Sequence, residues 1–315
     1  RDIGVTGVQT CALPICGIDK LFPSVWRSSW CKRDLKKKDV DLYHGLSHEI
    51  PRGIDRLDIR TVVTIHDLIF ERYPEQYNPI DVRIYRSKFR YACERADRII
   101  AISEQTKRDI IEFYQIPARK IKVCYQSCNP AFFESILDEE KSRVHSIYKL
   151  PDEYFLYVGS IIARKNLDRV IEAMGLIRKT SAIPLVVIGT GGQYEKRVRN
   201  TVNDLGLQDR ILFLSRSEQA KNSPTFQNAQ DFPAIYQMAT AMIYPSLFEG
   251  FGIPVLEALA SELPVITSNI SCLPEAGGPG SLLVDPQNIR SISDAMRSEE
   301  HTSELQSRQY LVCRL

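Results

Sequence analysis

The chain alternates short apolar runs with longer segments in which apolar residues recur every three or four positions. A short apolar run is typical of a strand buried in a parallel sheet, and the longer period is typical of an amphipathic helix. In the second half, strands are predicted at 155–159, 185–189, 211–215, 241–246, 264–269 and 281–285. The helices between them are predicted at 167–179, 194–206, 232–239 and 254–262. This order predicts right-handed β–α–β units and a doubly wound α/β sheet.

The first half shows the same alternation. Strands are predicted at 41–47, 61–67, 98–103 and 120–126, and helices at 80–97 and 104–115. Two of these strands end in a histidine or in His-Asp, as expected where functional groups gather at the carboxyl ends of parallel strands. The stretch from 128 to 150 lacks a clean period. We therefore divide the chain into a first domain, 16–128, a linker region, 129–150, that contains a lead-in helix, and a second domain, 151–296.

Two segments, the predicted helix 80–97 and the polar stretch 216–230, give further predictions about which residues are buried and which are exposed. In helix 80–97, we expect Ile80, Ile84, Tyr91 and Ala92 to face inward, which leaves a basic outer face. That face is typical of a solvated helix surface, and the alternative is peripheral contact with an anionic membrane. The polar segment 216–230 has little apolar content and predicts an exposed excursion.

The two ends of the chain do not share this pattern. VTGVQTCALPI (5–15) and RSEEHTSELQS (297–307) resemble translations of a DNA-sequencing library adapter read in opposite orientations. We therefore expect residues 1–15 and 297–315 to be artefacts that were not selected to fold. The first domain is then incomplete, and we expect the chain as written to be poorly stable or inactive, because missing edge strands expose apolar sheet surface.

Composition narrows the class of protein. The length of 315 residues fits two ordinary domains, and 43% hydrophobic with 25% charged residues is typical of a globular protein. A net charge of +2 gives no argument for a nucleic-acid partner. No apolar run reaches the ~18 residues of a membrane span. The eight cysteines have neither metal-site nor disulfide-framework spacing, which favours a reduced, cytoplasmic protein without a metal.

The candidate chemistry centres on YPSLFEGFGIPVLEALASELPVITS (244–268). Glu249 and Glu257 are separated by seven residues, and a glycine-rich turn between them leads into a helix with Pro254 in its first turn. Backbone N–H groups and the helix dipole make such a turn suitable for phosphate. Two carboxylates would repel phosphate, so they fit neutral hydroxyls of a sugar or ribose better. The alternative is a strand–helix turn with solvated glutamates.

Two further turns follow predicted strands. GSIIARKN (159–166) places Arg164 and Lys165 just past one strand, and GTGG (189–192) follows the next. The glycine turn is weak alone, because it is an incomplete dinucleotide fingerprint. Together the three turns predict a diphosphate site at the mouth of the sheet, where a charge-assisted hydrogen bond contributes on the order of 1.5–3 kcal/mol.

These motifs together resemble the retaining glycosyltransferases of family 4, in the stretches YVGSIIARKN, IGTGG and PSLFEGFGIPVLEALASELPVITSN. The resemblance covers roughly residues 41–296 and is most specific in the Glu-seven residues-Glu spacing. It implies the GT-B fold, in which two Rossmann-like domains face a cleft that holds a nucleotide-sugar donor. It also implies transfer of a mannose- or glucose-type hexose, with retention, from a GDP- or UDP-linked donor to a polysaccharide or a lipid-linked glycan, without a cofactor.

The resemblance also implies roles for single residues. Glu257 would bind the ribose hydroxyls, and Glu249 would contact the transferred sugar and its reacting face. Lys165 would neutralise the departing diphosphate. Ser160 stands where the family often has an arginine, so Arg164 becomes the second candidate cation. The remaining candidates are the amides of the turn and a histidine after a strand of the first domain: Gly250, Phe251, Gly252 and His66.

The chemistry is consistent without the family. Cleavage of the sugar–diphosphate bond leaves negative charge on the phosphate, which cations and a helix N-terminus stabilise. Positive charge develops on the anomeric carbon, which a carboxylate such as Glu249 stabilises. Two alternatives remain: another GT-B enzyme, such as a sugar-nucleotide epimerase or phosphorylase, and a noncatalytic nucleotide-sugar-binding or scaffolding protein. A phosphorylase would need a cofactor-bearing lysine, and the sequence has no stretch that resembles one.

Overall fold

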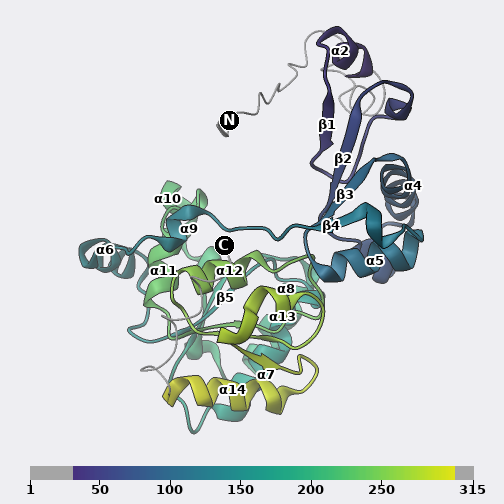
Figure 1. Ribbon diagram of the computed structural model, residues 1–315. Helices are drawn as coiled ribbons and strands as arrows, with labels where there is room; N and C mark the ends of the chain where they lie inside the picture. Colours follow the sequence, from purple (N-terminus) through teal and green to yellow (C-terminus); the bar gives the residue numbers. More distant parts are fainter. Residues whose placement is uncertain (1–30, 302–315) are drawn as a thin grey trace. The chain divides into compact units, whose positions relative to one another are not determined.

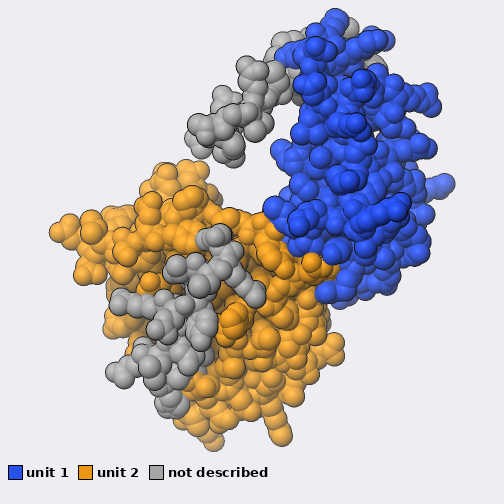
Figure 2. Space-filling model, viewed as in Figure 1, with its two compact units in different colours: residues 1–102, 106–124 blue, residues 103–105, 125–315 orange. Residues whose placement is uncertain are grey.

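The computed structural model describes residues 31–301 of the chain, and their side chains as far as residue 298 (Figure 1). Of the segments that we expect to be artefacts, residues 1–15 and 302–315 lie outside the described residues, whereas residues 297–301 form the end of the helix Ile289–His301. The chain divides into two compact units (Figure 2): unit 1 comprises residues 1–102 and 106–124, and unit 2 comprises residues 103–105 and 125–315. Each unit is built on its own parallel sheet, so the predicted α/β class with two Rossmann-like sheets is confirmed.

Unit 1 contains a four-stranded parallel sheet in the order β1-β2-β3-β4. The strands are β1 (Leu42–Gly45), β2 (Arg60–Ile65), β3 (Arg98–Ala101) and β4 (Ile121–Val123). Its helices are α2 (Cys31–Lys37), α3 (Ile69–Arg72), α4 (Pro79–Arg95), most of α5 (Glu104–Tyr114), and the short 3-10 turns η3 (Ile54–Arg56), η4 (Pro74–Gln76) and η5 (Ala118–Lys120). Val63 and Ile99 pair in register and are fully buried, which places the core beside the central strands.

Helix α4 begins where Asn78 accepts a hydrogen bond from the Ile80 backbone N–H, with Pro79 in the first turn. The predicted inward face was partly wrong. Ile80 is 69% exposed and Ile84 is 45% exposed, whereas Val82, Ala92 and Cys93 are buried. Two apolar series run along this helix, and the series that begins at Val82 packs against the core.

Unit 2 contains a six-stranded parallel sheet in the order β10-β9-β8-β5-β6-β7. The strands are β5 (Phe155–Val158), β6 (Leu185–Ile188), β7 (Ile211–Phe213), β8 (Ala241–Tyr244), β9 (Val265–Ser268) and β10 (Ser281–Val284). The chain winds outward from β5 to β7, returns to the other side of β5 at β8, and continues to β10. The winding direction therefore reverses between β5 and β8, and ligands of open α/β sheets bind at such a switch point, beyond the carboxyl ends of the strands.

Helices cover both faces of this sheet. Helix α7 packs against α8 and α14, and α12 packs against α13. Figure 1 shows α7 and α14 together on one side of unit 2 and α12 on the opposite side. The helices of unit 2 are α6 (Asp138–Tyr148), α7 (Leu167–Ile177), α8 (Gln193–Asp204), α9 (Glu218–Asn222), α10 (Pro224–Gln227), α11 (Phe232–Met238), α12 (Ile253–Ala260), α13 (Leu273–Gly277) and α14 (Ile289–His301). Short 3-10 turns join them: η6 (Pro130–Phe133), η7 (Ala163–Lys165), η8 (Gln208–Arg210), η9 (Leu214–Arg216) and η10 (Gly278–Gly280).

Segment 216–230 is largely exposed, as its polar composition predicted, but it is folded rather than irregular. It forms α9 and α10, and Ala220 and Phe226 are buried. The Phe226 ring packs against Tyr148 of α6 at 5.3 Å and against Phe232 of α11 at 5.2 Å between centroids. Phe226 therefore helps to fix this segment onto unit 2, together with hydrogen bonds between Ser223 and Tyr148 and between Thr225 and Asp231.

Among the helices of residues 31–301, none combines the length and the hydrophobicity that a transmembrane span requires.

Candidate functional site

The two chain segments that leave β5 and β8 at the switch point carry the charged residues of the site. The first runs from Gly159 to Asn166, and its short turn η7 contains Arg164 and Lys165. The second runs from Tyr244 to Gly252 and contains Glu249. Arg164 and Glu249 are both buried, at 8% exposure each. Burial of opposite charges at the carboxyl end of a sheet marks this place as a candidate site.

Two glycines allow the turns after β5 and β6 to lie against each other. Gly189 has a φ of +149°, and a side chain there would place its Cβ 1.9 Å from the Gly159 carbonyl oxygen. A Cβ on Gly191 would lie 2.1 Å from the Ile161 carbonyl oxygen, where a parallel bridge joins Ile161 to Gly191. Glycine is thus required at both positions, and the GTGG turn is brought beside the segment that carries Arg164 and Lys165.

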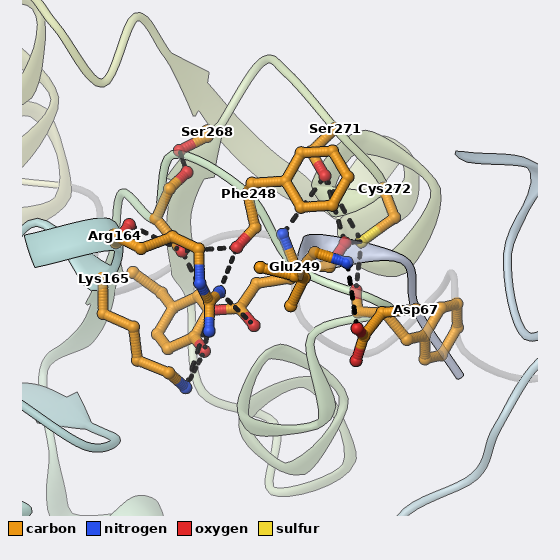
Figure 3. A network of polar contacts seen from close by, with 12 residues as sticks. Asp67, Arg164, Lys165, Phe248, Glu249, Ser268, Ser271 and Cys272 are labelled. Carbon is orange, nitrogen blue, oxygen red and sulfur yellow. Dashed lines mark hydrogen bonds and ion pairs between the residues drawn. The ribbon is translucent and has the colours of Figure 1, made fainter. Parts of the chain in front are cut away.

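Glu249 lies at the centre of the polar network (Figure 3). Arg164 Nη1 lies 3.0 Å from Glu249 Oε2, and Lys165 Nζ lies 3.5 Å from Oε1. The hydroxyls of Tyr244 and Ser246 each donate to Oε1 across 2.9 Å. Arg164 also donates to the Phe248 carbonyl. The carboxylate therefore binds two cations and two hydroxyl groups within unit 2.

The charges in this network stabilise one another. Burial by itself would raise the pKa of Glu249, but Lys165, Arg164 and the Ser246 hydroxyl outweigh it, so the pKa is lowered. Burial lowers the pKa of Lys165, and the nearby Glu249 charge opposes this change. Glu249 is thus ionised at neutral pH and compensates the positive charge of its neighbours.

The turn that follows Glu249 is held from the start of α13. The Glu249 N–H donates to Ser271 Oγ across 3.2 Å, and Cys272 Sγ donates to the carbonyls of Glu249 and Phe251 across 3.1 Å each. Gly252 has a φ of +108° and ends the turn before α12 begins. These contacts fix the Gly250–Gly252 backbone, whose N–H groups are the predicted phosphate and sugar ligands.

Glu257 occupies a separate environment on α12. It accepts a hydrogen bond from Tyr236 Oη of α11 across 2.8 Å. Burial raises the pKa of Glu257, and the Tyr236 hydrogen bond only partly opposes this. The two glutamates of the motif are therefore not equivalent: Glu249 is paired with cations, whereas Glu257 has a neutral hydroxyl as its partner.

Two further sequence-predicted residues, Ser160 and His66, have different surroundings. Ser160 is exposed in the segment after β5. His66 follows β2 in unit 1, where its Nε2 lies 2.8 Å from the Leu46 carbonyl oxygen and its backbone N–H donates to His48 Nδ1 across 3.3 Å. Burial, together with the nearby His66, lowers the pKa of His48 to about 4, so His48 is neutral near pH 7.

Part of the basic face of α4 is compensated within unit 1. Arg86 binds Glu71 at 2.6 Å, Lys88 binds Glu49 at 3.1 Å and Arg95 binds Asp55 at 3.3 Å. Such pairing reduces the attraction of this helix to an anionic surface. Within residues 31–301, no cluster of three or more His, Cys, Asp or Glu residues is arranged to hold a metal ion.

Sequence reasoning missed Tyr244, Ser246, Tyr236, Ser271 and Cys272. These side chains support the predicted carboxylates and turns, but none belongs to a charged or glycine-rich pattern. Tyr244 and Ser246 had one usable signal, because both lie at the end of the strand that leads to Glu249.

Comparison with known proteins gives two family matches. Residues 138–310 match the family described as Glycosyl transferases group 1, and residues 3–132 match Glycosyltransferase Family 4. The O-antigen chain mannosyltransferase B of Escherichia coli is 28% identical over 85% of this chain and 66% of its own length. The O-antigen chain mannosyltransferase RfbU of Salmonella typhimurium is 28% identical over 78% of this chain. The chain spans 62% of RfbU, so it corresponds to only part of these relatives.

Solved structures agree on the fold. A glycosyltransferase from Rickettsia africae superposes with a TM-score of 0.64, at 19% identity, over 95% of this chain and 74% of its own. Anabaena Alr3699/HepE, solved in complex with UDP and glucose, superposes with a TM-score of 0.68 at 16% identity, over 92% of this chain and 75% of its own. At these identities the likeness establishes the fold alone, and that fold is GT-B.

Proposed function

The chain belongs to the glycosyl transferases group 1 family, and from this premise we propose that it is a retaining hexosyltransferase. The donor is a nucleotide-diphosphate sugar with a mannose- or glucose-type hexose, and the acceptor is a polysaccharide or a lipid-linked glycan. The observation that carries the proposal is the buried contact of Arg164 and Lys165 with Glu249 at the switch point of the unit 2 sheet. A solvated strand–helix turn, the structural alternative, does not require a buried carboxylate with two cations.

In this proposal Lys165 and Arg164 stabilise the negative charge that develops on the departing diphosphate. Both side chains are largely buried, so their interaction with an incoming phosphate is screened less than at an exposed surface. The amides of Gly250, Phe251 and Gly252 add donors at the start of α12. Ser160, which stands where the family often has an arginine, is exposed in the segment that carries Arg164 and Lys165. It supplies a hydroxyl group, and the proposed chemistry does not require a charge at this position.

Glu249 contacts the transferred sugar and stabilises the positive charge that develops on the anomeric carbon. It is ionised because its neighbours lower its pKa, as this role requires. The incoming diphosphate competes with Glu249 for Arg164 and Lys165. Donor binding therefore exchanges an internal counter-ion for the phosphate and leaves the carboxylate available to the sugar.

The identity of the sugar is supported by the relatives alone. Two relatives are O-antigen mannosyltransferases, which favours mannose and a bacterial surface glycan as acceptor. A GDP-linked or UDP-linked donor remains the proposal for the nucleotide. We keep His66 as the contact from the first domain, as the family resemblance implies, and front-face substitution as the route to retention.

A cytoplasmic location at the inner face of a membrane completes the proposal. Free thiols on Cys93, Cys124 and Cys272 are consistent with a reducing compartment. Support for peripheral membrane contact comes from the exposed apolar residues of α4, Ile80 and Ile84, rather than from its paired cations.

The test is a donor screen on the full-length protein, with release of UDP or GDP measured for each nucleotide sugar in the presence of lipid-linked acceptors. The proposal expects release with one donor class and an acceptor-dependent product. Absence of release with every donor and acceptor would exclude the transferase. If Glu249→Ala and Lys165→Ala leave the biological function unchanged, a noncatalytic nucleotide-sugar-binding protein is favoured instead.

Replacement of Glu257 by glutamine is expected to affect donor binding and folding stability in two ways that can be measured separately. We expect KM for the donor to rise about 10-fold with little change in kcat, since a carboxylate that accepts two ribose hydroxyls is lost. The raised pKa of Glu257 means that folding favours its protonated form. Wild-type stability is therefore reduced as pH rises through this pKa, and Glu257→Gln removes that reduction.

Thermal melts at pH 4 and pH 7 check the second effect, and donor-dependent kinetics check the first. We expect Glu257→Gln to melt higher than wild type at pH 7, with a smaller difference at pH 4. Glu153→Gln, at an exposed position of unit 2, is the control and should change neither quantity. A rise in KM without the pH-dependent gain in stability would contradict the buried, hydroxyl-bound environment of Glu257.

A further inference from the structure

Tyr244 ends β8 with its side chain buried, and its hydroxyl lies between the oppositely charged groups of the site. Lys165 Nζ donates to Tyr244 Oη across 2.8 Å, and Tyr244 Oη donates to Glu249 Oε1 across 2.9 Å. The direct distance from Lys165 Nζ to Oε1 is 3.5 Å, which is longer than a charge-assisted hydrogen bond. The phenolic hydroxyl is thus the hydrogen-bonded link between the lysine and the glutamate.

We propose that Tyr244 is a positioning residue, whose hydroxyl fixes the Lys165 ammonium and the Glu249 carboxylate relative to each other before the donor binds. This inference rests on the proposed function, in which Lys165 serves the departing diphosphate and Glu249 serves the sugar. The two groups act on opposite ends of one breaking bond, so an error in their separation lowers the rate even when both are present.

The structure fits tyrosine at this position better than other residues. A phenolic oxygen accepts one hydrogen bond while it donates another, and Tyr244 uses both capacities. The backbone of Tyr244 is fixed by Thr267 Oγ1, which donates to its carbonyl across 2.9 Å. The ring also lies 5.3 Å from Lys165 Nζ. Burial and the Glu249 charge raise the pKa of Tyr244 well above its usual range, so the hydroxyl keeps its proton at neutral pH.

The charged and titratable groups around this link come from four elements. Arg164 and Lys165 belong to η7, and Tyr157 belongs to β5. Glu249 lies in the turn after β8, and Cys272 lies directly before α13. Tyr157 donates to the backbone carbonyl of Lys165 across 3.2 Å. Of the two tyrosines, Tyr244 is therefore the one whose hydroxyl contacts both charged side chains.

The first test needs no activity. The Glu249 pKa is measured by carboxyl-carbon NMR of the ligand-free full-length protein, in wild type, Tyr244→Phe and Tyr154→Phe. Tyr154 is the matched control, because it is fully buried and its hydroxyl donates to the Ile235 carbonyl across 2.6 Å. We expect the Glu249 pKa to rise in Tyr244→Phe alone, since the carboxylate loses one donor and a firmly held cation. An unchanged value would overturn the proposed link.

The second test measures transfer. We expect Tyr244→Phe to lower kcat/KM by about 10- to 100-fold, the loss typical of one hydrogen bond to a charged group, with most of the loss in kcat. The acid limb of its pH–rate profile should shift to higher pH, whereas Tyr154→Phe should retain the wild-type profile. A Tyr244→Phe enzyme with lower melting temperature but wild-type kinetics would reduce Tyr244 to a packing role. Complete inactivity of wild type would refute the transferase, and the NMR titration would still report on the link.

Discussion

Replacement of Lys165 by methionine is expected to lower kcat by about 100- to 1,000-fold. Methionine preserves most of the apolar stem, so the change mainly removes the ammonium group that is proposed to stabilise the departing diphosphate. Loss of one preorganised electrostatic donor of this kind typically costs that much in rate. The ammonium also contacts Glu249 and Tyr244, so the donor KM should change as well, but by a smaller factor. Steady-state kinetics with the donor identified by the screen measure both values.

Lys179→Met provides the control for this variant, because Lys179 is an exposed lysine of the same unit. It should retain wild-type kinetics. A Lys165→Met enzyme with full kcat would show that leaving-group charge is stabilised elsewhere, and Arg164 would be the next residue to replace. Equal loss of activity in both variants would indicate a general effect of net charge on the protein.

The strand and helix order of the fold could be predicted because parallel strands are buried on both faces. Each therefore appears as an uninterrupted apolar run, as in Leu185–Ile188 and Ala241–Tyr244. Strand order could not be read from these runs. The switch point between β5 and β8, which locates the site, depends on tertiary pairing of segments far apart in sequence.

Amphipathic periods were less reliable than strand runs. In α4, Ile80 and Ile84 fit an inward face as well as Val82 does, and only packing against the core selects between the two series. In segment 216–230 the polar composition correctly indicates exposure, but it does not show that Ala220 and Phe226 are buried within two short helices. A sequence pattern indicates which faces of a helix are apolar, whereas packing against neighbouring elements determines which of these faces is buried.

The charged residues of the candidate site followed from their spacing, but their pairing did not. Arg164 was expected to substitute for the arginine that Ser160 replaces, and the structure places it against Glu249 with Lys165. The ligand-free site therefore carries its own counter-ion. This has an energetic consequence: an anionic ligand must displace Glu249 from its cations, and the attraction gained from the phosphate is reduced by the attraction lost.

Replacement of Glu249 by glutamine should consequently move transfer and nucleotide binding in opposite directions. Glutamine has nearly the same shape and can still accept from Tyr244 and Ser246, but it no longer compensates Arg164 and Lys165. We expect kcat to fall about 1,000-fold, because the charge that stabilises the anomeric carbon is lost. We expect the affinity for the free nucleoside diphosphate, measured by calorimetry, to rise about 10-fold.

The same substitution has a pH-dependent effect on stability. The pKa of Glu249 is lowered in the folded protein, so the stability that its charge contributes is present above the ordinary glutamate pKa and is lost as pH falls through the folded value. Removal of one partner of a buried ion pair costs about 3–5 kcal/mol. Glu249→Gln should therefore be clearly less stable than wild type at pH 7, and the difference should shrink in acid.

Asp231→Asn tests whether these effects are specific, because Asp231 is also buried but binds Arg143, across 2.6 Å, instead of Arg164 or Lys165. Both variants lose a buried carboxylate and should lose stability. Tighter nucleotide binding is expected in Glu249→Gln alone, since only there are the phosphate-binding cations released from their counter-ion. If Glu249→Gln binds the nucleoside diphosphate more weakly than wild type, the carboxylate holds the cations in place for the phosphate instead of competing with it.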